Sequence, residues 1–326
     1  MINWGIIGCG EVTEVKSGPA FNKVPGSRLV AVMRRNAAQA ADYAQRHGVP
    51  TWYADATALI NDPRVNAIYI ATPPSSHEAY ALQAIAAAKP VYLEKPMTPD
   101  AAAAHRVAVA AAQSGVKLTV AHYRRAQPFY QKLKQLITDE TIGQIQLITL
   151  SYSRHPLDAT QLTQSRNAWR VDPAIAGGGL FHDLAPHQLD ILYHIFGTAS
   201  ALQGIALQQS GRYMAPDLVS GTIAWPQGIL FTGTWNFNLP AWQSQQDECV
   251  ITGTDGEIRF SFFEQAPLQL KKSGQVTNFG FPALPHVQEP MISQVVEYFQ
   301  GKRENPCTAQ EGAQVMEWID RIAVQP

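Results

Sequence analysis

The first 121 residues alternate short apolar runs with segments that have a helix-compatible pattern, and this alternation restricts the fold more than any other feature. The apolar runs that predict strands are residues 2–7, 29–33, 67–71, 91–93 and 116–121. The segments that predict helices are residues 11–23, 37–47, 75–89 and 99–114. Strands separated by helices of about 10–15 residues indicate βαβ units and a parallel sheet. We therefore expect an α/β fold with a doubly wound, Rossmann-type parallel sheet over residues 1–122.

A glycine turn follows the first strand directly. Gly8, Cys9 and Gly10 lead into Glu11 and Val12, which begin the first predicted helix. Glycines between a first strand and a first helix allow the backbone to approach the pyrophosphate of a dinucleotide. Threonine at position 13, where such sites usually have Gly or Ala, predicts a looser turn. We expect these residues to bind a dinucleotide; the alternative is an ordinary tight turn.

The end of the second strand bears on the choice of cofactor. A site for NAD usually has Asp or Glu there to bind the ribose 2′-hydroxyl, but this chain has Arg34 and Arg35. Guanidinium groups suit a 2′-phosphate. The sequence therefore predicts NADP, with NAD possible, and the alternative is a pair of solvated arginines.

The later strands also end in polar residues, where ligands of parallel sheets bind. These ends carry Thr72 and Pro73, then Glu94 and Lys95, then His122 and Tyr123. Pro96 rigidifies the turn that holds Lys95 beside the expected nicotinamide. Lys95 is therefore unlike an ordinary surface lysine.

Residues 123–326 have a different pattern, which predicts a second domain. A helix is expected at 129–138, and two more at 289–300 and 308–322. Strands at 145–153, from residue 202, and at 217–225, 229–237, 248–252, 256–260 and 267–271 predict a mostly antiparallel sheet. In the strand 229–237, Phe231, Trp235 and Phe237 alternate with Thr232, Thr234 and Asn236. One face of this sheet therefore packs on helices, and the other face needs a different partner.

The stretch 177–194 combines three glycines with an unusual helix. At about 100° per residue, Asp183, His187, Asp190 and His194 share one face. This stripe has no Lys or Glu, and Asp and His are residues that exchange protons, bind metals or hydrogen-bond substrate hydroxyls. We interpret it as a functional face that the glycines allow a ligand to approach. The alternative is a polar stripe that faces water.

Length and composition limit the possible partners. A chain of 326 residues predicts two domains, and 46% hydrophobic residues provide for packed cores. A formal net charge of -1 gives no global field for nucleic acid, and no apolar stretch approaches the ~18 residues of a membrane span. The isolated cysteines Cys9, Cys249 and Cys307 suggest neither disulfides nor a metal pair. We expect a cytoplasmic protein with a small-molecule partner.

Four matches in order carry a resemblance to a known family. They are GCG after the first strand, ATPPSSH at 71–77, EKP at 94–96, and GGGLFHDLAPHQLD at 177–190, and WRVDP at 169–173 also fits. The chain thus resembles the glucose-fructose oxidoreductase, inositol dehydrogenase and MocA family of NAD(P)-dependent enzymes. The resemblance implies a Rossmann domain with His77 among its cofactor-binding residues. It also implies a second, α+β domain at 123–326 with a large, open, mostly antiparallel sheet, which serves substrate binding and oligomerisation, and a homodimer or tetramer. It also implies that Lys95, Asp183 and His187 occupy active-site positions and that substrates are sugars, cyclitols, keto derivatives or diols.

The segment 154–170 supplies candidate substrate contacts. Arg166, Asn167 and Arg170 are donors for hydroxyl oxygens, and Trp169 offers a flat face for a sugar ring. Tyr123 is a further candidate at the end of its strand. The alternative is that Trp169 and Arg170 only brace the loop.

Three classes of function remain open. The leading hypothesis is hydride transfer between NADP and a carbon that bears a hydroxyl or carbonyl, without a metal. We assign His187 as the acid-base group, Lys95 as its electrostatic partner and Asp183 as the orienting group, and the reverse assignment of Lys95 and His187 remains open. The other classes are a catalytically silent NAD(P)-binding regulator and a hydrolase or lyase with a metal on Asp183, His187, Asp190 and His194.

Overall fold

The computed structural model describes residues 1–326, apart from the side chains of Ser165 and Arg166. Contacts divide the chain into two compact units. The first unit contains residues 1–127 and 284–316, and the second contains residues 128–283 and 317–326. This division differs from the predicted boundary at residue 122, because residues 284–316 pack with the first unit although they come late in the chain.

The first unit contains a parallel sheet, as the alternating pattern predicted. Its strands are β1 (Ile2–Ile7), β2 (Ser27–Met33), β3 (Thr51–Tyr53), β4 (Ala67–Ile70), β5 (Val91–Leu93) and β6 (Leu118–Val120). They lie in the order β3-β2-β1-β4-β5-β6, and every neighbouring pair is parallel. This order is that of a Rossmann fold. The short strand β3 was not predicted, because three residues are too few for a periodic signal.

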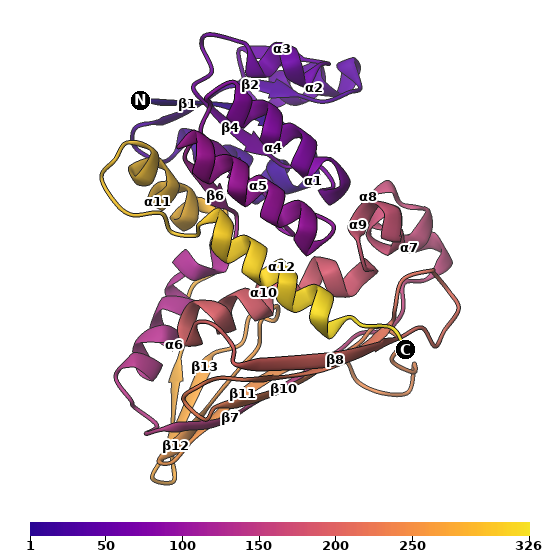
Figure 1. Ribbon diagram of the computed structural model, residues 1–326, viewed down its shortest axis with the longest axis vertical. Helices are drawn as coiled ribbons and strands as arrows, with labels where there is room; N and C mark the ends of the chain where they lie inside the picture. The colour runs from indigo at the N-terminus through magenta and orange to yellow at the C-terminus, as the bar shows by residue number, and fades with distance from the viewer. The chain divides into compact units, whose positions relative to one another are not determined.

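Helices and 3₁₀ turns complete the first unit (Figure 1). They are α1 (Glu11–Val15), α2 (Ala37–His47), α3 (Ala56–Ile60), α4 (His77–Ala86), α5 (Ala101–Ser114), α11 (Glu289–Phe299) and the first half of α12 (Ala309–Ile322), with 3₁₀ turns η1 (Gly18–Asn22), η2 (Pro74–Ser76) and η3 (Tyr123–Ala126). The ends of α2 have local causes. The Asn36 side chain accepts a hydrogen bond from the backbone N–H of Gln39, and Gly48 ends the helix at φ +65°.

The first helix is shorter than predicted. The pattern predicted a helix over 11–23, but α1 ends at Val15 and a 3₁₀ turn begins at Gly18. Pro19 lacks a backbone N–H and so cannot continue an α-helix. A Cβ atom on Gly18 would also collide with the carbonyl oxygen of Thr13. The chain therefore turns sharply where the sequence pattern suggested a continuous helix.

The second unit is built on a mixed sheet. Its strands are β7 (Ile145–Ser153), β8 (Ala201–Leu207), β9 (Leu218–Ala224), β10 (Leu230–Asn236), β11 (Gln246–Gly253), β12 (Gly256–Phe260), β13 (Leu268–Lys272) and β14 (Gln275–Phe279). They lie in the order β14-β13-β12-β11-β7-β10-β9-β8. The large, mostly antiparallel sheet that the sequence predicted is therefore confirmed. The prediction missed β14, whose residues are mainly exposed and lack a buried face.

Two strands of this sheet correct the expected antiparallel pattern. β7 and β10 run parallel, with Leu147 opposite Leu230 and Ser153 opposite Asn236. Residues 154–229 between them, which include α10 and the β8–β9 pair, form the long crossover that parallel strands require. The carboxyl ends of β7 and β10 consequently lie side by side, and the Arg154 N–H donates to the Asn236 carbonyl oxygen at 2.7 Å.

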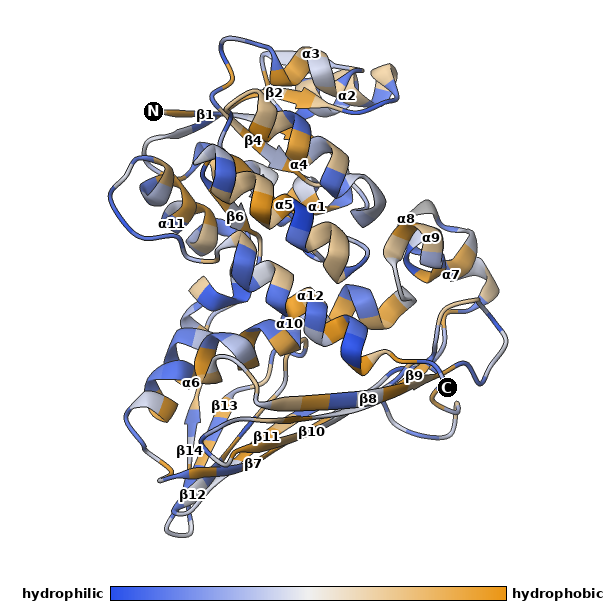
Figure 2. Cartoon of the chain, in the orientation of Figure 1, coloured by the Kyte–Doolittle hydropathy of each residue, from blue (hydrophilic) through white to orange (hydrophobic). Residues whose placement is uncertain are grey.

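The alternation in β10 confirms the predicted two-faced sheet. Phe231, Trp235 and Phe237 are completely buried, whereas Leu230 and Thr234 are exposed. Figure 2 shows hydrophobic and hydrophilic residues alternating along strands of this sheet. The buried face packs on helix α10 (Gly179–Phe196), because the Phe181 ring meets the Trp235 ring edge-on with centroids 5.0 Å apart.

The second unit also contains the helix α6 (Pro128–Thr138), the end of α12 and several short helical turns. These turns are α7 (Ala159–Thr163), α8 (Ser165–Ala168), η4 (Trp169–Val171) and α9 (Pro173–Ala176). The sequence pattern left residues 154–178 irregular, and the structure has these short helical turns there. Among the described residues, no helix is both long enough and apolar enough to cross a membrane.

Candidate active site

The turn after β1 fits the pyrophosphate of a dinucleotide. Gly8 has φ +91°, and a Cβ atom there would lie 2.8 Å from the backbone nitrogen of Thr72, so the fold itself requires glycine. At Gly10, by contrast, the nearest described atom to a Cβ would be 3.8 Å away. Protein packing therefore leaves the space above Gly10 open. An open backbone at this place is what a closely approaching phosphate needs.

Cys9 lies inside the same turn and is completely buried. Burial raises the pKa of its thiol to about 11. A thiol that stays protonated at neutral pH is a poor nucleophile. Cys9 therefore contributes its backbone to the turn and no thiol chemistry.

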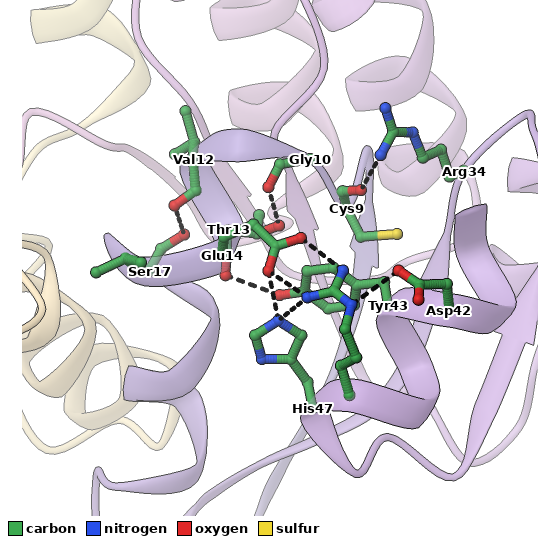
Figure 3. A network of polar contacts seen from close by, with 12 residues as sticks. Cys9, Gly10, Val12, Thr13, Glu14, Ser17, Arg34, Asp42, Tyr43 and His47 are labelled. Atoms are coloured by element: carbon green, nitrogen blue, oxygen red, sulfur yellow. Dashed lines mark hydrogen bonds and ion pairs between the residues drawn. The ribbon is translucent and has the colours of Figure 1, made fainter.

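Arg34 extends back over this turn from the end of β2. Its Nη1 atom donates to the Cys9 carbonyl oxygen at 3.4 Å (Figure 3). Arg34 is half-buried, whereas Arg35 beside it is exposed. The structure thus places one guanidinium at the dinucleotide turn, with the second at the adjacent surface.

A polar network holds α1 against α2 (Figure 3). The Glu14 carboxylate accepts two hydrogen bonds of 2.8 Å from Arg46, and one of its oxygens lies 2.7 Å from His47 Nε2. These contacts, chiefly those of Arg46, lower the pKa of Glu14 to about 2. The Tyr43 hydroxyl donates to the Thr13 carbonyl oxygen at 2.7 Å. The sequence pattern did not reveal this network.

Thr13 fills the position where many dinucleotide sites have a smaller residue. It is completely buried, and its hydroxyl donates to the Gly10 carbonyl oxygen at 2.8 Å. The extra side chain is thus accommodated by a hydrogen bond within the turn. Glu11 and Val12 form the first turn of α1 next to it.

His77 connects the loops that follow β4 and β5. Its Nε2 atom lies 2.7 Å from the Thr72 carbonyl oxygen, and its Nδ1 atom lies 3.0 Å from the Pro96 carbonyl oxygen. The ring is completely buried, and burial lowers its pKa to about 4. The sequence placed His77 among the cofactor contacts, and in the structure its ring joins the Thr72 loop to the Lys95 loop.

The Glu94 side chain also points into the protein. It is 5% exposed and accepts hydrogen bonds from the Tyr69 hydroxyl at 2.5 Å and from Gln288 Nε2 at 2.6 Å. Its second oxygen accepts from the Lys95 backbone N–H at 3.1 Å. Glu94 therefore fixes the backbone of Lys95. Gln288 lies 194 residues further along the chain, so no local pattern could have identified it.

Four further candidate residues at or after the strand ends lie at the surface of the first unit or just below it. Thr72, Pro73 and Lys95 are half-buried, and Tyr123 in η3 is 8% exposed. The Lys95–Pro96 peptide bond is cis. A half-buried lysine on a fixed backbone can present its ammonium group to a ligand.

In the second unit, α10 does not have the solvent-facing stripe of the alternative interpretation. His187 is 6% exposed and Asp190 is 1% exposed. The expectation that the glycines at the start of α10 leave room for a ligand is wrong for two of them. A Cβ atom on Gly178 would collide with the His182 ring, and one on Gly179 would collide with the Ala215 side chain. These glycines allow close packing of the protein itself.

Asp183 is held by the loop that precedes α10. Arg170 Nε donates to Asp183 Oδ2 at 2.9 Å, and the Arg170 guanidinium lies 4.7 Å from the centre of the Trp169 ring. Arg170 thus fixes Asp183, and the Trp169 ring lies against the Arg170 guanidinium. Asn167 Nδ2 donates to the Gln161 carbonyl oxygen at 3.1 Å, and the side chain of Arg166 lies outside the described residues.

Phe263 is a neighbour of His187 that the sequence did not reveal. The two rings meet edge-on with centroids 5.7 Å apart. Asp247 holds the backbone at this point, because its carboxylate accepts from the N–H groups of Phe262, Phe263 and Glu264. Asp247 lies 16 residues from Phe263, so only the folded sheet brings them together.

The structure does not support the alternative of a metal site on the stripe of α10. Among the residues whose side chains are described, no group of three or more His, Cys, Asp or Glu side chains could hold a metal ion. His194 Nε2 lies 3.1 Å from Lys134 Nζ, and Asp190 is buried. The four side chains of the stripe therefore do not converge on one point.

Two models of one protein family match this chain. Residues 2–122 match the model of an oxidoreductase family with an NAD-binding Rossmann fold, and residues 130–259 match the C-terminal domain of the same family. Oxidoreductase P35 of Formosa agariphila is 44% identical over 98% of this chain and 97% of its own length. The trans-1,2-dihydrobenzene-1,2-diol dehydrogenase of Mus musculus is 28% identical over 87% of this chain and 81% of its own.

A solved structure shows the same fold. Levoglucosan dehydrogenase in complex with NADH and levoglucosan superposes with a TM-score of 0.81, at 21% identity, over 98% of this chain and 96% of that one. The chain therefore belongs to the glucose-fructose oxidoreductase, inositol dehydrogenase and MocA family and is an NAD(P)-dependent oxidoreductase.

Proposed function

We propose that this protein transfers a hydride between NADP(H) and the hydroxyl or carbonyl carbon of a sugar, cyclitol, keto sugar or related diol. The observation that carries the proposal is the pair Asp183 and His187, one turn apart on α10 and both largely removed from water. A dihydrodiol dehydrogenase and a levoglucosan dehydrogenase among the similar proteins support the substrate class. The presence of Lys95, Asp183 and His187 argues against a catalytically silent regulator.

Each residue has a separate proposed role in this reaction. The nicotinamide supplies or accepts the hydride when it is bound. His187 takes the hydroxyl proton in oxidation and returns it in reduction, because imidazole exchanges protons near neutral pH. Lys95 stabilises negative charge that develops on the reacting oxygen. Lys95 as the proton donor, with His187 as its partner, is the alternative assignment.

Asp183 is the orienting group of this proposal. Its contact with Arg170 keeps one carboxylate oxygen engaged at 2.9 Å and limits how the side chain can rotate. A carboxylate held in this way can accept a hydrogen bond from a substrate hydroxyl in one fixed direction. Arg170 and Trp169 would then serve the substrate chiefly through Asp183 and the loop, and Tyr123, Asn167 and Arg166 remain candidate substrate contacts.

We propose NADP as the preferred cofactor. Arg34 already lies at the dinucleotide turn, and a guanidinium there can form charge-assisted hydrogen bonds with a 2′-phosphate. The chain has no Asp or Glu at residues 34–36 to bind the 2′-hydroxyl of NAD. Gly8 to Val12, Thr72, Pro73 and Lys95 are the other residues proposed to meet the cofactor, with His77 and Glu94 fixing the loops behind them.

We also propose that the protein is a homodimer or a tetramer, in which two subunits meet through the exposed face of the second unit's sheet. We further propose that it works in a reducing cytoplasm. The exposed side chains of this face include Leu147 and Leu230, which are opposite each other in β7 and β10. Apolar residues on an exposed sheet face mark interaction surfaces. The three buried cysteines fit a reducing compartment.

A substrate panel tests the proposed function. Pyranoses, cyclitols, keto sugars and diols would be offered with NADP(H) and with NAD(H), in both directions, while the nicotinamide absorbance is followed. We expect turnover with at least one class and a higher kcat/KM with the phosphorylated cofactor. A protein that binds NADP tightly and turns over no member of the panel would contradict the proposal.

A further inference from the structure

The second unit contains a pocket that the proposed chemistry does not use. It has a volume of about 410 Å³ and lies where the parallel strands β7 and β10 end, next to helix α10. This volume is within the range of about 300–1,000 Å³ that small-molecule pockets have. The part of α10 that lines it is the half that carries Asp183.

One side of the pocket is apolar. Leu180 and Leu184 come from α10, and Phe237 follows β10. Phe237 is completely buried and Leu180 is 8% exposed, so both are fixed parts of the core. An apolar wall of this kind can cover the C–H face of a sugar ring.

The rim of the pocket presents mainly hydrogen-bond donors. The side-chain oxygen of Gln245 accepts from the His155 N–H at 3.2 Å, and the side-chain oxygen of Gln161 accepts from the Asp158 N–H at 2.9 Å. With their oxygens engaged by the backbone, both amides offer their NH₂ groups. A ligand that fits this rim must supply oxygen acceptors.

Arg154 adds a third donor group, but not an isolated positive charge. Its guanidinium lies 4.7 Å from the centre of the Tyr152 ring and donates to the Tyr152 hydroxyl at 3.0 Å. Glu264 lies 3.4 Å and Asp247 3.9 Å from its terminal nitrogens. These carboxylates offset the charge, so the pocket suits a neutral hydroxylated ring better than a polyanion.

The pocket is close to the proposed acid-base group. Leu184 follows Asp183 directly and precedes His187 by three residues, and side chains at this spacing are neighbours on a helix. A ligand whose reacting ring meets His187 can therefore place its next ring against Leu184.

We infer that this pocket is a second subsite, which binds the neutral sugar ring adjacent to the reacting ring of a saccharide with at least two units. The inference rests on the proposed function, because it takes the reacting ring to lie at Asp183 and His187. It predicts that a disaccharide binds more tightly than the monosaccharide that forms its reacting end.

The test measures binding and turnover separately. Glucose, maltose and cellobiose would be titrated calorimetrically into the full-length protein saturated with NADPH, and the same sugars would be assayed with NADP⁺. We expect at least one disaccharide to bind about 10-fold or more tightly than glucose, since its second ring gains several hydrogen bonds and apolar contacts.

Three variants locate the gain. Gln245→Glu keeps the oxygen that His155 uses but removes the NH₂ group, and it should lower disaccharide affinity by about 3- to 10-fold. Leu157→Trp places a large ring at a half-buried position in the pocket wall and should reduce disaccharide affinity to that of glucose. Gln243→Glu makes the same change of charge at an exposed position that does not line the pocket, and disaccharide affinity should be unchanged.

The outcomes separate this inference from the proposed function. Disaccharides that bind no better than glucose, or a preference that survives both Gln245→Glu and Leu157→Trp, would overturn the subsite. A disaccharide preference that both variants abolish supports the subsite even if no sugar is turned over, and only the proposed oxidoreductase function would then be contradicted.

Discussion

His187 and Lys95, the two residues proposed to react, are held by the protein in different ways. His187 is buried on a long helix, with the Phe263 ring against it. Lys95 is half-buried at a strand end, with its backbone fixed by Glu94 and the following loop fixed by His77. The His187 ring and the Lys95 backbone are therefore held by residues that are not proposed to react, and the proposed acid-base roles require such preorganisation.

We expect His187→Ala and Lys95→Ala each to lower turnover by roughly 10² or more, the usual size of a lost acid-base contribution. The dissociation constant for NADP should change little, because His187 is not proposed to meet the cofactor and Lys95 is proposed to meet it beside the nicotinamide, not at the phosphates. Steady-state kinetics and cofactor titration measure the two effects. His105→Ala and Lys302→Ala remove an exposed histidine and an exposed lysine as controls. If His187→Ala keeps full turnover, α10 is not the catalytic face.

A second prediction at this scale concerns Arg34. Arg34→Ala should weaken NADP binding by about 10-fold or more and leave NAD binding nearly unchanged, because a lost charge-assisted hydrogen bond to the 2′-phosphate affects one cofactor only. Fluorescence titration with both reduced cofactors measures this. Arg28→Ala, which removes an exposed arginine at the second residue of the same strand, is the matched control. Equal losses for both cofactors would show that Arg34 only supports the turn.

At the scale of elements, α1 depends on its neighbours. Five residues are far too few for an independently stable helix. Tyr43 and Arg46 of α2 supply the missing support through Thr13 and Glu14. The turn proposed to bind the dinucleotide is therefore stabilised by the second helix as well as by its own sequence.

This dependence predicts a pH-sensitive stability. The native pKa of Glu14 is about 2, against an ordinary value of 4.5, so its stabilising contribution is complete above pH 4.5 and is lost as the pH falls toward 2. A third of the side chain is exposed, so solvent screening limits the effect of Glu14→Gln to about 1 kcal/mol or less. Urea unfolding at pH 7 should show this difference, and it should shrink below pH 4.5.

Asp42→Asn provides the control for this experiment. Asp42 also contacts Arg46, but within α2, and its side chain is 62% exposed. Its removal leaves the link between α1 and α2 intact. A loss of stability as large as that of Glu14→Gln would mean that the link between the helices is not what matters.

At the scale of the whole molecule, one face of the second unit's sheet exposes apolar side chains. Leu230 is 43% exposed and Leu147 is 36% exposed on that face, whereas Trp235 and Phe231 are buried on the other. We expect Leu230→Arg to convert a dimer into a monomer, because an arginine would place a charge in the proposed apolar interface. Light scattering at micromolar concentrations measures the mass.

The control for the assembly is Val109→Arg. Val109 is 53% exposed on α5 of the first unit, so Val109→Arg also replaces an exposed apolar side chain with a charged one, but away from the sheet. It should keep the mass of the wild type. A wild-type protein that is monomeric throughout the concentration range would contradict the proposed dimer.

Much of the fold followed from local patterns. The strand–turn–helix order predicted the parallel sheet, because alternating apolar runs and helical segments leave few ways to bury both. The period of two in residues 229–237 predicted which side chains of β10 are buried. The length of α1, the strand β3 and the parallel pairing of β7 with β10 were missed, since short elements carry little signal and strand direction depends on the route of the chain.

The sequence by itself determined the residue types of the candidate site, and the tertiary structure decided what each one touches. The patterns identified Gly8, Gly10, Lys95, Asp183 and His187, because glycine turns and helix periodicity are local properties of the chain. They did not identify Gln288 beside Glu94, Arg46 beside Glu14 or Phe263 beside His187, which are 194, 32 and 76 residues apart. Such contacts arise only when the chain is folded, so a local pattern has no physical means to record them. The same reason applies to Gly178 and Gly179 at the start of α10. The space that we expected to be open to a ligand there is filled by His182 and Ala215.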